Sequence, residues 1–138
     1  MRIEQNTLKA EDFQPLFASA GWGVKPLDQI EVALKNSLVT FCVYEDDKVI
    51  GMARLLGDRA MAYYLKDFVI YPEYQGKGVG RAVIRYIEEY ISSELKEGWA
   101  AAFELMSAGG KEGFYKKMGF EEKSVPGKGT GMYKRIQK

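Results

Sequence analysis

The chain has 138 residues, of which 46% are apolar and 28% are charged, and 20 Lys and Arg against 19 Asp and Glu leave a net charge of +1. This length predicts one domain over residues 1–138 with a substantial core. The balanced charge argues against a nucleic-acid binder that relies on a general basic surface. Since no apolar run is long enough for a membrane span and the start is too polar for a signal peptide, we expect a cytoplasmic protein without membrane contacts.

The chain has no histidine and a single cysteine, Cys42. These counts exclude serine-histidine triads, histidine metal clusters and intrachain disulfides, and we expect no metal site. Chemistry must therefore depend on Tyr, Asp, Glu, Lys, water or backbone groups. Cys42 is a poor candidate for an acyl-carrying nucleophile, because no histidine can activate it and buried strand cysteines are commonly inert.

The first half of the chain predicts a strand, two helices and a three-stranded antiparallel meander. Apolar spacing and turn residues place the strands at 2–6, 38–45, 48–56 and 61–71 and the helices at 10–20 and 26–36. In the strand over 61–71, apolar positions shift from odd numbers, as at Leu65, to even numbers, as at Phe68. Such a shift predicts one inserted residue, or bulge, in this strand.

The second half begins with the clearest helix, whose apolar residues recur at helical spacing from Val79 to Leu95 and for which Gly98 is the expected stop signal. The apolar run 99–106 predicts a strand buried on both faces, so residues 61–106 form a parallel β-α-β unit. A short helix over 111–118 and a closing hairpin, with strands at 120–125 and 132–137, complete the chain. The fold class is therefore mixed α/β (α+β), with a mostly antiparallel central sheet.

A glycine-rich segment, Gln75 to Gly80, lies where the strand over 61–71 must turn into the long helix. It contains no Ser, Thr, Asp or Asn to cap the helix start. Uncapped N–H groups and the positive end of the helix dipole attract anions, and Lys77 and Arg81 add positive charge. The spacing matches neither the dinucleotide fingerprint nor the P-loop. An ordinary glycine-softened turn is the structural alternative.

Residues 75–80, as Gln-x-x-Gly-x-Gly, resemble the pyrophosphate-binding motif of the GCN5-related N-acetyltransferases, Arg/Gln-x-x-Gly-x-Gly/Ala. The preceding residues 67–74 resemble the strand before this motif, and residues 113–120 resemble the second family signature, in which a tyrosine precedes Gly-Phe. Together with the element order, the resemblance covers nearly the whole chain and is weakest over residues 7–37. It implies a single GNAT-like domain that uses acetyl-CoA as acyl donor.

The resemblance also implies site residues. Backbone groups of Phe68, Val69 and Ile70 would hydrogen-bond the pantetheine arm at the bulge, with a strand N–H polarising the carbonyl. The pyrophosphate would bind to the loop N–H groups, which belong to Gln75, Gly76, Lys77, Gly78, Val79, Gly80 and Arg81. Many family members have an asparagine seven residues before the signature tyrosine, whereas this chain has Ala108 there. We therefore expect that contact to be absent or supplied differently.

Tyr115, the signature tyrosine, is the candidate acid, because a phenol with a pKa of about 10 can protonate a thiolate whose thiol has a pKa of about 8.5. Packing beside Phe114 and Met118 is its structural alternative. Asp67 and, on the next strand, Glu104 are candidate bases acting through water. A salt bridge or a solvated strand position is the alternative for both.

The function favoured by this reading is direct acetyl transfer from acetyl-CoA to a primary amine of a small molecule or protein. The sequence leaves the acceptor open among polyamines, amino acids, antibiotics, aromatic amines and protein lysines. It equally allows a monomer or a homodimer. The alternative is a protein without enzymatic activity, namely a non-catalytic acyl-CoA sensor or partner-binding module that keeps the anion-binding glycine loop, which we call the cradle. A phosphate-binding domain unrelated to coenzyme A is a further, less favoured alternative.

Overall fold

The computed structural model describes residues 1–122, 132, 134, 135, 137 and 138. These residues group into two compact units, Met1–Met106 and Ser107–Lys138, and each unit is described by itself. Within the described residues, no helix is long and apolar enough to cross a membrane. The prediction of one domain over 1–138 stays a prediction.

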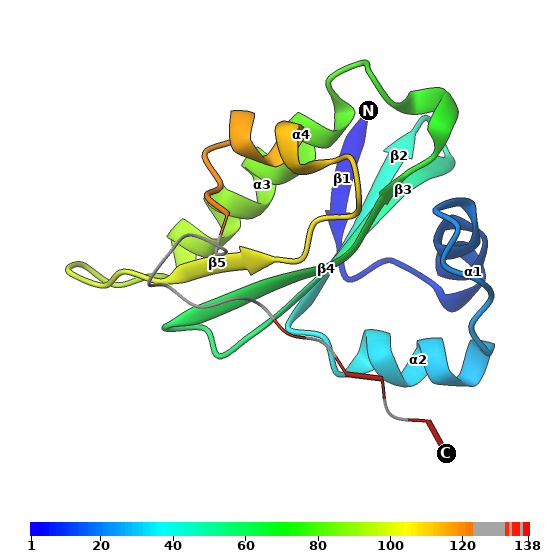
Figure 1. Cartoon of the computed structure of the whole chain (residues 1–138), viewed down its shortest axis with the longest axis horizontal. Helices are drawn as coiled ribbons and strands as arrows, with labels where there is room; N and C mark the ends of the chain where they lie inside the picture. Colours follow the sequence, from blue (N-terminus) through cyan, green and yellow to red (C-terminus); the bar gives the residue numbers. More distant parts are fainter. Residues whose placement is uncertain (123–131, 133, 136) are drawn as a thin grey trace. The chain divides into compact units, whose positions relative to one another are not determined.

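The first unit is a five-stranded sheet with the strands in chain order, β1-β2-β3-β4-β5 (Figure 1). The first four strands pair antiparallel and β5 pairs parallel with β4, which confirms the mostly antiparallel sheet and its β-α-β unit. Its elements are β1 (Arg2–Gln5), α1 (Ala10–Ser19), α2 (Leu27–Lys35), β2 (Val39–Glu45), β3 (Lys48–Gly57), β4 (Ala62–Ile70), η1 (Pro72–Tyr74), α3 (Val79–Glu94) and β5 (Ala102–Leu105).

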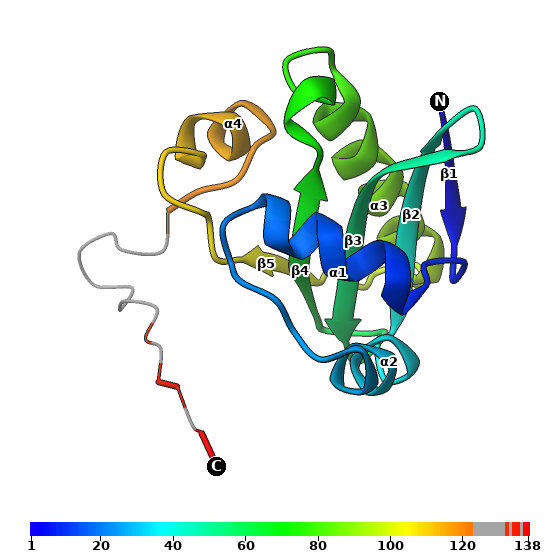
Figure 2. The same ribbon diagram turned by 90° about the vertical axis from the view of Figure 1, so that its right-hand side faces the viewer.

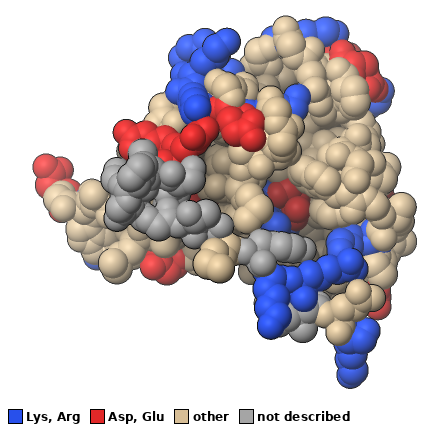
Figure 3. Space-filling model, in the orientation of Figure 1, with Lys and Arg blue, Asp and Glu red and all other residues tan. Residues whose placement is uncertain are grey.

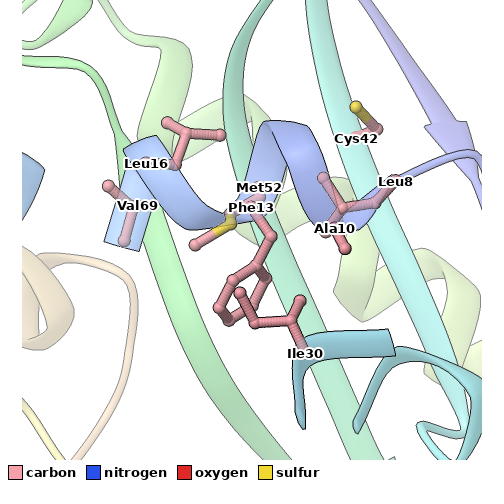
Figure 4. Packing of buried hydrophobic residues seen from close by; sticks show 8 residues of the cluster. All are labelled: Leu8, Ala10, Phe13, Leu16, Ile30, Cys42, Met52 and Val69. Atoms are coloured by element: carbon pink, nitrogen blue, oxygen red, sulfur yellow. The ribbon is translucent and has the colours of Figure 1, made fainter. Parts of the chain in front are cut away.

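Helices α1 and α2 cover one face of the sheet and α3 covers the other (Figure 2). Strand side chains alternate between the two faces, so each strand supplies residues to two apolar layers. The layer beneath α1 and α2, seen in Figure 4, is made of Leu8, Ala10, Phe13, Leu16, Ile30, Cys42, Met52 and Val69. All eight side chains are buried, and the layer joins α1 to the middle strands of the sheet.

Helix α3 packs by one apolar stripe on the opposite face. The buried residues of the stripe are Val83, Ile84, Ile87 and Ile91. From the sheet, Phe41 makes edge-on ring contacts with Tyr86 and Tyr90, at centroid distances of 5.8 and 5.7 Å. Such aromatic pairs add to the stabilisation from buried area alone. They fix α3 on the sheet, and with it the position of the loop that precedes α3.

The largest differences from the predicted bounds lie in the long helix α3 and in strand β5. Helix α3 ends at Glu94, four residues before the predicted stop at Gly98, because Leu95 already has an extended backbone. Strand β5 is shorter than the predicted 99–106, and none of its residues is fully buried. Its first residue is exposed and the other three are only half-buried, so the prediction of a strand buried on both faces was wrong.

The second unit contains one described helix, α4 (Glu112–Lys117). It matches the short helix predicted over 111–118. Most of the predicted closing hairpin, including residues 123–131, lies outside the described residues. The described residues within it, 120–122 among them, are not in strands.

Candidate active site

Strand β4 contains the predicted bulge. Met52 pairs with Val69, but the next paired residue on β3, Arg54, lies opposite Lys66. Two residues of β4, Asp67 and Phe68, therefore share the space opposite one residue of β3, which is the arrangement of a bulge. Asp67 has a φ of +51°, in the left-handed region that Asp tolerates better than most residues. The shift of apolar positions along the sequence thus correctly located this feature.

Beyond the bulge, β4 has an edge without a neighbouring strand among the described residues, since β5 pairs with Ala62–Leu65 alone. The Tyr71 N–H donates to the Ile50 carbonyl oxygen at 2.9 Å. Hydrogen-bonded and non-hydrogen-bonded pairs alternate in an antiparallel ladder, so the backbone groups of Ile70 face away from β3 and those of Val69 face towards it. The edge therefore presents Ile70, whereas Val69 is turned towards the sheet.

The glycine loop joins this strand to α3. Gly76 and Gly78 have φ values of +73° and +85°, and Gly78 is the N-cap of α3 without any side-chain capping bond. The first N–H groups of a helix have no acceptor within it, so those of Val79 to Arg81 lack the intrahelical bonds made further along. A Cβ at Gly76 or Gly78 would meet no atom within 4 Å. The predicted uncapped helix start is confirmed, and open space lies beside the two glycines.

Basic side chains lie close to the loop, and Figure 3 shows Lys and Arg side chains, with acidic ones beside them, along the upper border of the molecule, where Figure 1 places the loop. Lys77 Nζ lies 5.6 Å from the centre of the Tyr74 ring, and Lys48 Nζ lies 5.3 Å from the same ring. Lys48 also approaches Glu73, with 4.0 Å between Nζ and Oε1. Together with the exposed Arg81, these groups give the loop a positive field suited to a diphosphate.

Gln75, the first residue of the motif, is bonded within the protein. Its Nε2 donates to the carbonyl oxygen of Ile70 at 2.8 Å. This bond connects the start of the loop to the end of β4 and occupies one of the backbone groups that face the open edge. The predicted contact of Gln75 with a cofactor stays a prediction. In the structure its side chain has a bracing role, meaning that it holds the start of the loop against the end of β4.

Asp67, one of the two candidate bases, lies in a largely buried ion pair. Arg54 Nε donates to Asp67 Oδ2 at 2.7 Å, and the two side chains are 12% and 8% exposed. Arg54 Nη1 also donates to the carbonyl oxygen of Ala33 and to Ser37 Oγ. The salt bridge that the sequence left open as an alternative is therefore present, and it engages Oδ2 of Asp67. Sequence reasoning missed Arg54, although an arginine within the apolar strand 48–57 was a visible signal.

The remaining candidates of the first unit are Glu104 and Cys42. Glu104 is half-buried on β5 and pairs in register with Tyr64. Cys42 is fully buried, and this burial raises the pKa of its thiol, which keeps the thiol protonated and unreactive. Within the part of the chain that the structure describes, no group of three His, Cys, Asp or Glu residues could hold a metal ion.

Tyr115 lies on α4, in the second unit. It is half-buried, and its ring makes edge-on contacts with Phe114 and Phe120 at centroid distances of 5.1 and 5.7 Å. Burial raises the pKa of the Tyr115 phenol above its ordinary value of 10, so the phenol keeps its proton at neutral pH. Ala108 lies in an exposed turn, where its carbonyl oxygen accepts the Lys111 N–H at 3.1 Å.

Comparison with known proteins places these features in a family. Residues 36–122 match the family model described as an acetyltransferase (GNAT) domain. The chain is 30% identical over 128 residues to an uncharacterized N-acetyltransferase, ycf52, of Pyropia yezoensis, and this match covers 90% of the chain and 71% of that protein. It is 31% identical over 121 residues to the histone acetyltransferase TAP1 of Glycine max, a match that covers 80% of the chain and 51% of that protein.

A solved structure shares the fold over its full length. It is a protein of unknown function from meticillin-resistant Staphylococcus aureus, described as a "probable acetyltransferase". The two chains are 27% identical, superpose with a TM-score of 0.83 and cover 98% of each other. The mixed α/β fold predicted from the sequence is therefore confirmed.

Proposed function

The chain belongs to the GCN5-related N-acetyltransferase family, and from this premise we propose that it transfers an acetyl group directly from acetyl-CoA to a primary amine. Family membership supports acetyl transfer in general. The donor, the amine acceptor and the direct route are the parts that this proposal adds. The acceptor amine belongs to a small molecule or a protein.

The choice of acetyl-CoA as donor rests on one observation. The start of α3 is uncapped, and it follows two glycines, Gly76 and Gly78, in the left-handed conformation. Glycine tolerates this conformation without strain, and the missing Cβ atoms leave room for a ligand against the backbone. The N–H groups of Val79, Gly80 and Arg81 point out of the first turn of α3 and suit phosphate oxygens. The residues present therefore fit the diphosphate of coenzyme A.

The open edge of β4 suits the pantetheine arm, which contains two amide groups. An extended amide chain can pair with an exposed strand edge as a further strand would. Ile70 turns its N–H towards this edge, while its carbonyl oxygen there accepts from Gln75 Nε2. Phe68 lies at the bulge, where a strand N–H could polarise a carbonyl. The bulge and the loop thus provide separate positions for the two ends of the donor.

When bound, acetyl-CoA supplies an activated thioester, from which the acceptor nitrogen gains the acetyl group and loses a proton while the coenzyme sulfur gains one. The proton donor in this proposal is Tyr115, the residue that the family resemblance assigns, and its raised pKa keeps the phenol protonated at neutral pH. The phenolate left after the transfer regains a proton from water. The proton from the amine leaves through water. Asp67 is engaged with Arg54 and needs no part in that transfer.

The test is a thiol-release assay with acetyl-CoA and a panel of amines that includes polyamines, amino acids, aminoglycosides, aromatic amines and lysine peptides. Release of coenzyme A that depends on one amine class, with acetylated amine found by mass spectrometry, would support the proposal. Binding of acetyl-CoA without turnover of any amine would favour the non-catalytic sensor. Stabilisation by other nucleotides but not by acetyl-CoA would contradict both. Location in the cytoplasm and a monomeric or homodimeric state stay predictions.

A further inference from the structure

The guanidinium of Arg54 connects two elements that are distant in the sequence, the bulge of β4 and the end of α2. Its Nε donates to Asp67 Oδ2 at 2.7 Å. Its Nη1 lies 3.3 Å from the Ala33 carbonyl oxygen and 3.2 Å from Ser37 Oγ. One largely buried side chain therefore connects the strand that carries the donor site to the helix beside it.

On the β4 side, Arg54 binds the residue with the least common backbone conformation in the strand. Asp67 has a φ of +51° and begins the bulge, and its side chain is 8% exposed. A buried carboxylate requires a partner, and its interaction with Arg54 Nε fixes the direction of the side chain. Phe68, Val69 and Ile70 follow directly, so the conformation of Asp67 determines how this segment leaves the bulge.

On the α2 side, Arg54 binds where the helix ends. Ser37 Oγ donates to the Ala33 carbonyl oxygen at 2.7 Å, so Arg54, Ser37 and Ala33 form a closed set of hydrogen bonds. The last carbonyl groups of a helix lack intrahelical donors and carry the negative end of its dipole. A positive charge is favourable there, and a shift of the last turn of α2 would move the partner of Asp67.

We propose that Arg54 and Asp67 are positioning residues for acetyl transfer, which hold the β4 bulge in the conformation that presents the edge at Ile70 to the acyl donor and connect the bulge to the end of α2. This inference rests on the proposed function. Neither side chain needs to touch the reacting atoms. The pair acts through the backbone that follows Asp67, and α2 supplies the second support.

If the Arg54–Asp67 pair only stabilised the fold, its loss would have different effects from those expected of positioning residues. A buried ion pair is by itself weak evidence for stability, because desolvation of the two charges offsets much of their attraction. If the pair served the fold alone, its loss would lower the melting temperature and leave the kinetics of the folded enzyme unchanged. If the pair positions the bulge, donor affinity and turnover fall even at temperatures at which the variant is fully folded.

The experiment compares Arg54→Met, Asp67→Asn and the double variant with Arg59→Met. Asparagine tolerates the left-handed region, so Asp67→Asn removes the charge without excluding the native backbone. The control, Arg59→Met, removes another arginine ion pair of the first unit, that with Glu94, which joins the turn before β4 to the end of α3. Acetyl-CoA affinity is measured by isothermal titration calorimetry and kcat/KM by thiol release, at a temperature at which circular dichroism shows every variant folded.

We expect each single variant to lose about 100-fold in kcat/KM for acetyl-CoA, the order of loss that small misplacement of reacting groups causes. The double variant should lose little more, since breaking the pair once removes the shared effect. Arg59→Met should stay within about twofold of the wild type. Wild-type affinity and kcat/KM in both single variants, with stability alone reduced, would overturn the proposal.

The rate of amide hydrogen exchange measures the conformation of the bulge without any acyl donor present. The amides of residues 66–71 should exchange faster in Arg54→Met and Asp67→Asn than in the wild type, while Arg59→Met leaves them unchanged. If wild-type protein failed to bind acetyl-CoA, the proposed function would be wrong, and this exchange would still decide the role of the pair. Unchanged exchange over 66–71 in both single variants would overturn it.

Discussion

The side-chain amide of Gln75 donates a hydrogen bond of 2.8 Å to the carbonyl oxygen of Ile70. Gln75 begins the glycine loop and Ile70 ends β4, so this bond joins the two parts of the candidate donor site. The motif is thus more than a set of glycines, because its first residue fixes the loop to the strand that precedes it. This relationship suggests the first test.

Replacing Gln75 by alanine should weaken acetyl-CoA binding through the position of the loop. Loss of one neutral hydrogen bond costs about 1 kcal/mol, which corresponds to about fivefold in the dissociation constant. Isothermal titration calorimetry measures the change. Gln14→Ala is the matched control, since Gln14 Nε2 donates to the Lys25 carbonyl oxygen at the same distance of 2.8 Å and lies outside the loop. Equal effects of the two substitutions on affinity would contradict the bracing role of Gln75.

Gly78→Ala should abolish measurable acetyl-CoA binding at a moderate cost in stability. A residue with a Cβ pays about 1 kcal/mol or somewhat more in the left-handed region, and the new methyl group would project into the open space of the cradle. Gly98→Ala is a close control, because Gly98 has a φ of +82° and equally open surroundings away from the loop. Thermal melts should show similar losses for both variants, while titration with acetyl-CoA should separate them. Unimpaired binding by Gly78→Ala would exclude the cradle.

Tyr115→Phe should lower kcat by about 100-fold with little change in KM, the size of effect typical of a general acid. Burial raises the pKa of Tyr115, so the acid form persists across the neutral and mildly alkaline range. We therefore expect no loss of wild-type kcat from ionisation of Tyr115 below about pH 10. A pH profile of kcat for both proteins tests this. Wild-type turnover by Tyr115→Phe would remove the acid assignment.

Tyr63 should make the first unit sensitive to alkali. The side chain is fully buried, its hydroxyl donates to Glu94 Oε1 at 3.3 Å, and burial followed by the charge of Glu94 raises the pKa of its phenol. A raised folded-state pKa means that the stabilisation is complete below the unfolded value, about 10, and is lost as the pH rises through the folded value. Urea unfolding at a series of alkaline pH values should show a steep fall for the wild type.

The matched variant for this prediction is Tyr63→Phe. It should be less stable at neutral pH by about 1 kcal/mol, because one hydrogen bond is lost, and should show a shallower fall in alkali. Burial also contributes to raising the pKa of Tyr71, so the fall should be reduced rather than abolished. Parallel curves for wild type and variant would show that Tyr63 is not responsible.

Cys42→Ala should retain full turnover. The thiol is fully buried and its pKa is raised, chiefly by burial, so it should carry no acyl group. The substitution should cost about 1 kcal/mol through lost packing, as measured by urea unfolding. A thiol reagent should label Cys42 in denatured but not in native protein. Loss of turnover in a folded Cys42→Ala protein, or a trapped acyl-cysteine, would contradict direct transfer.

Local patterns along the chain predicted a large part of the fold. Alternation and turn residues located the meander, and the shift of apolar positions between Leu65 and Phe68 located the bulge, because one extra residue reverses the faces of all that follow. The stop of α3 was placed too late, since the chain leaves the helix at Leu95 before it reaches the glycine. The apolar run around β5 was taken as buried on both faces, although hydrophobicity alone does not reveal whether other elements cover both faces of a strand.

By itself, the sequence determined the order of the elements from β1 to α4, the uncapped helix start and the family motifs, because these depend on residues close together in the chain. Tertiary structure decided which polar side chains are paired with one another. Arg54 lies on β3, Asp67 on β4 and Ser37 just after α2, and only the register of β3 against β4 and the position of α2 bring their polar atoms within hydrogen-bonding distance. A buried charge must find its partner wherever packing places one. For that reason Asp67, a plausible base in the sequence, is half of an ion pair in the fold.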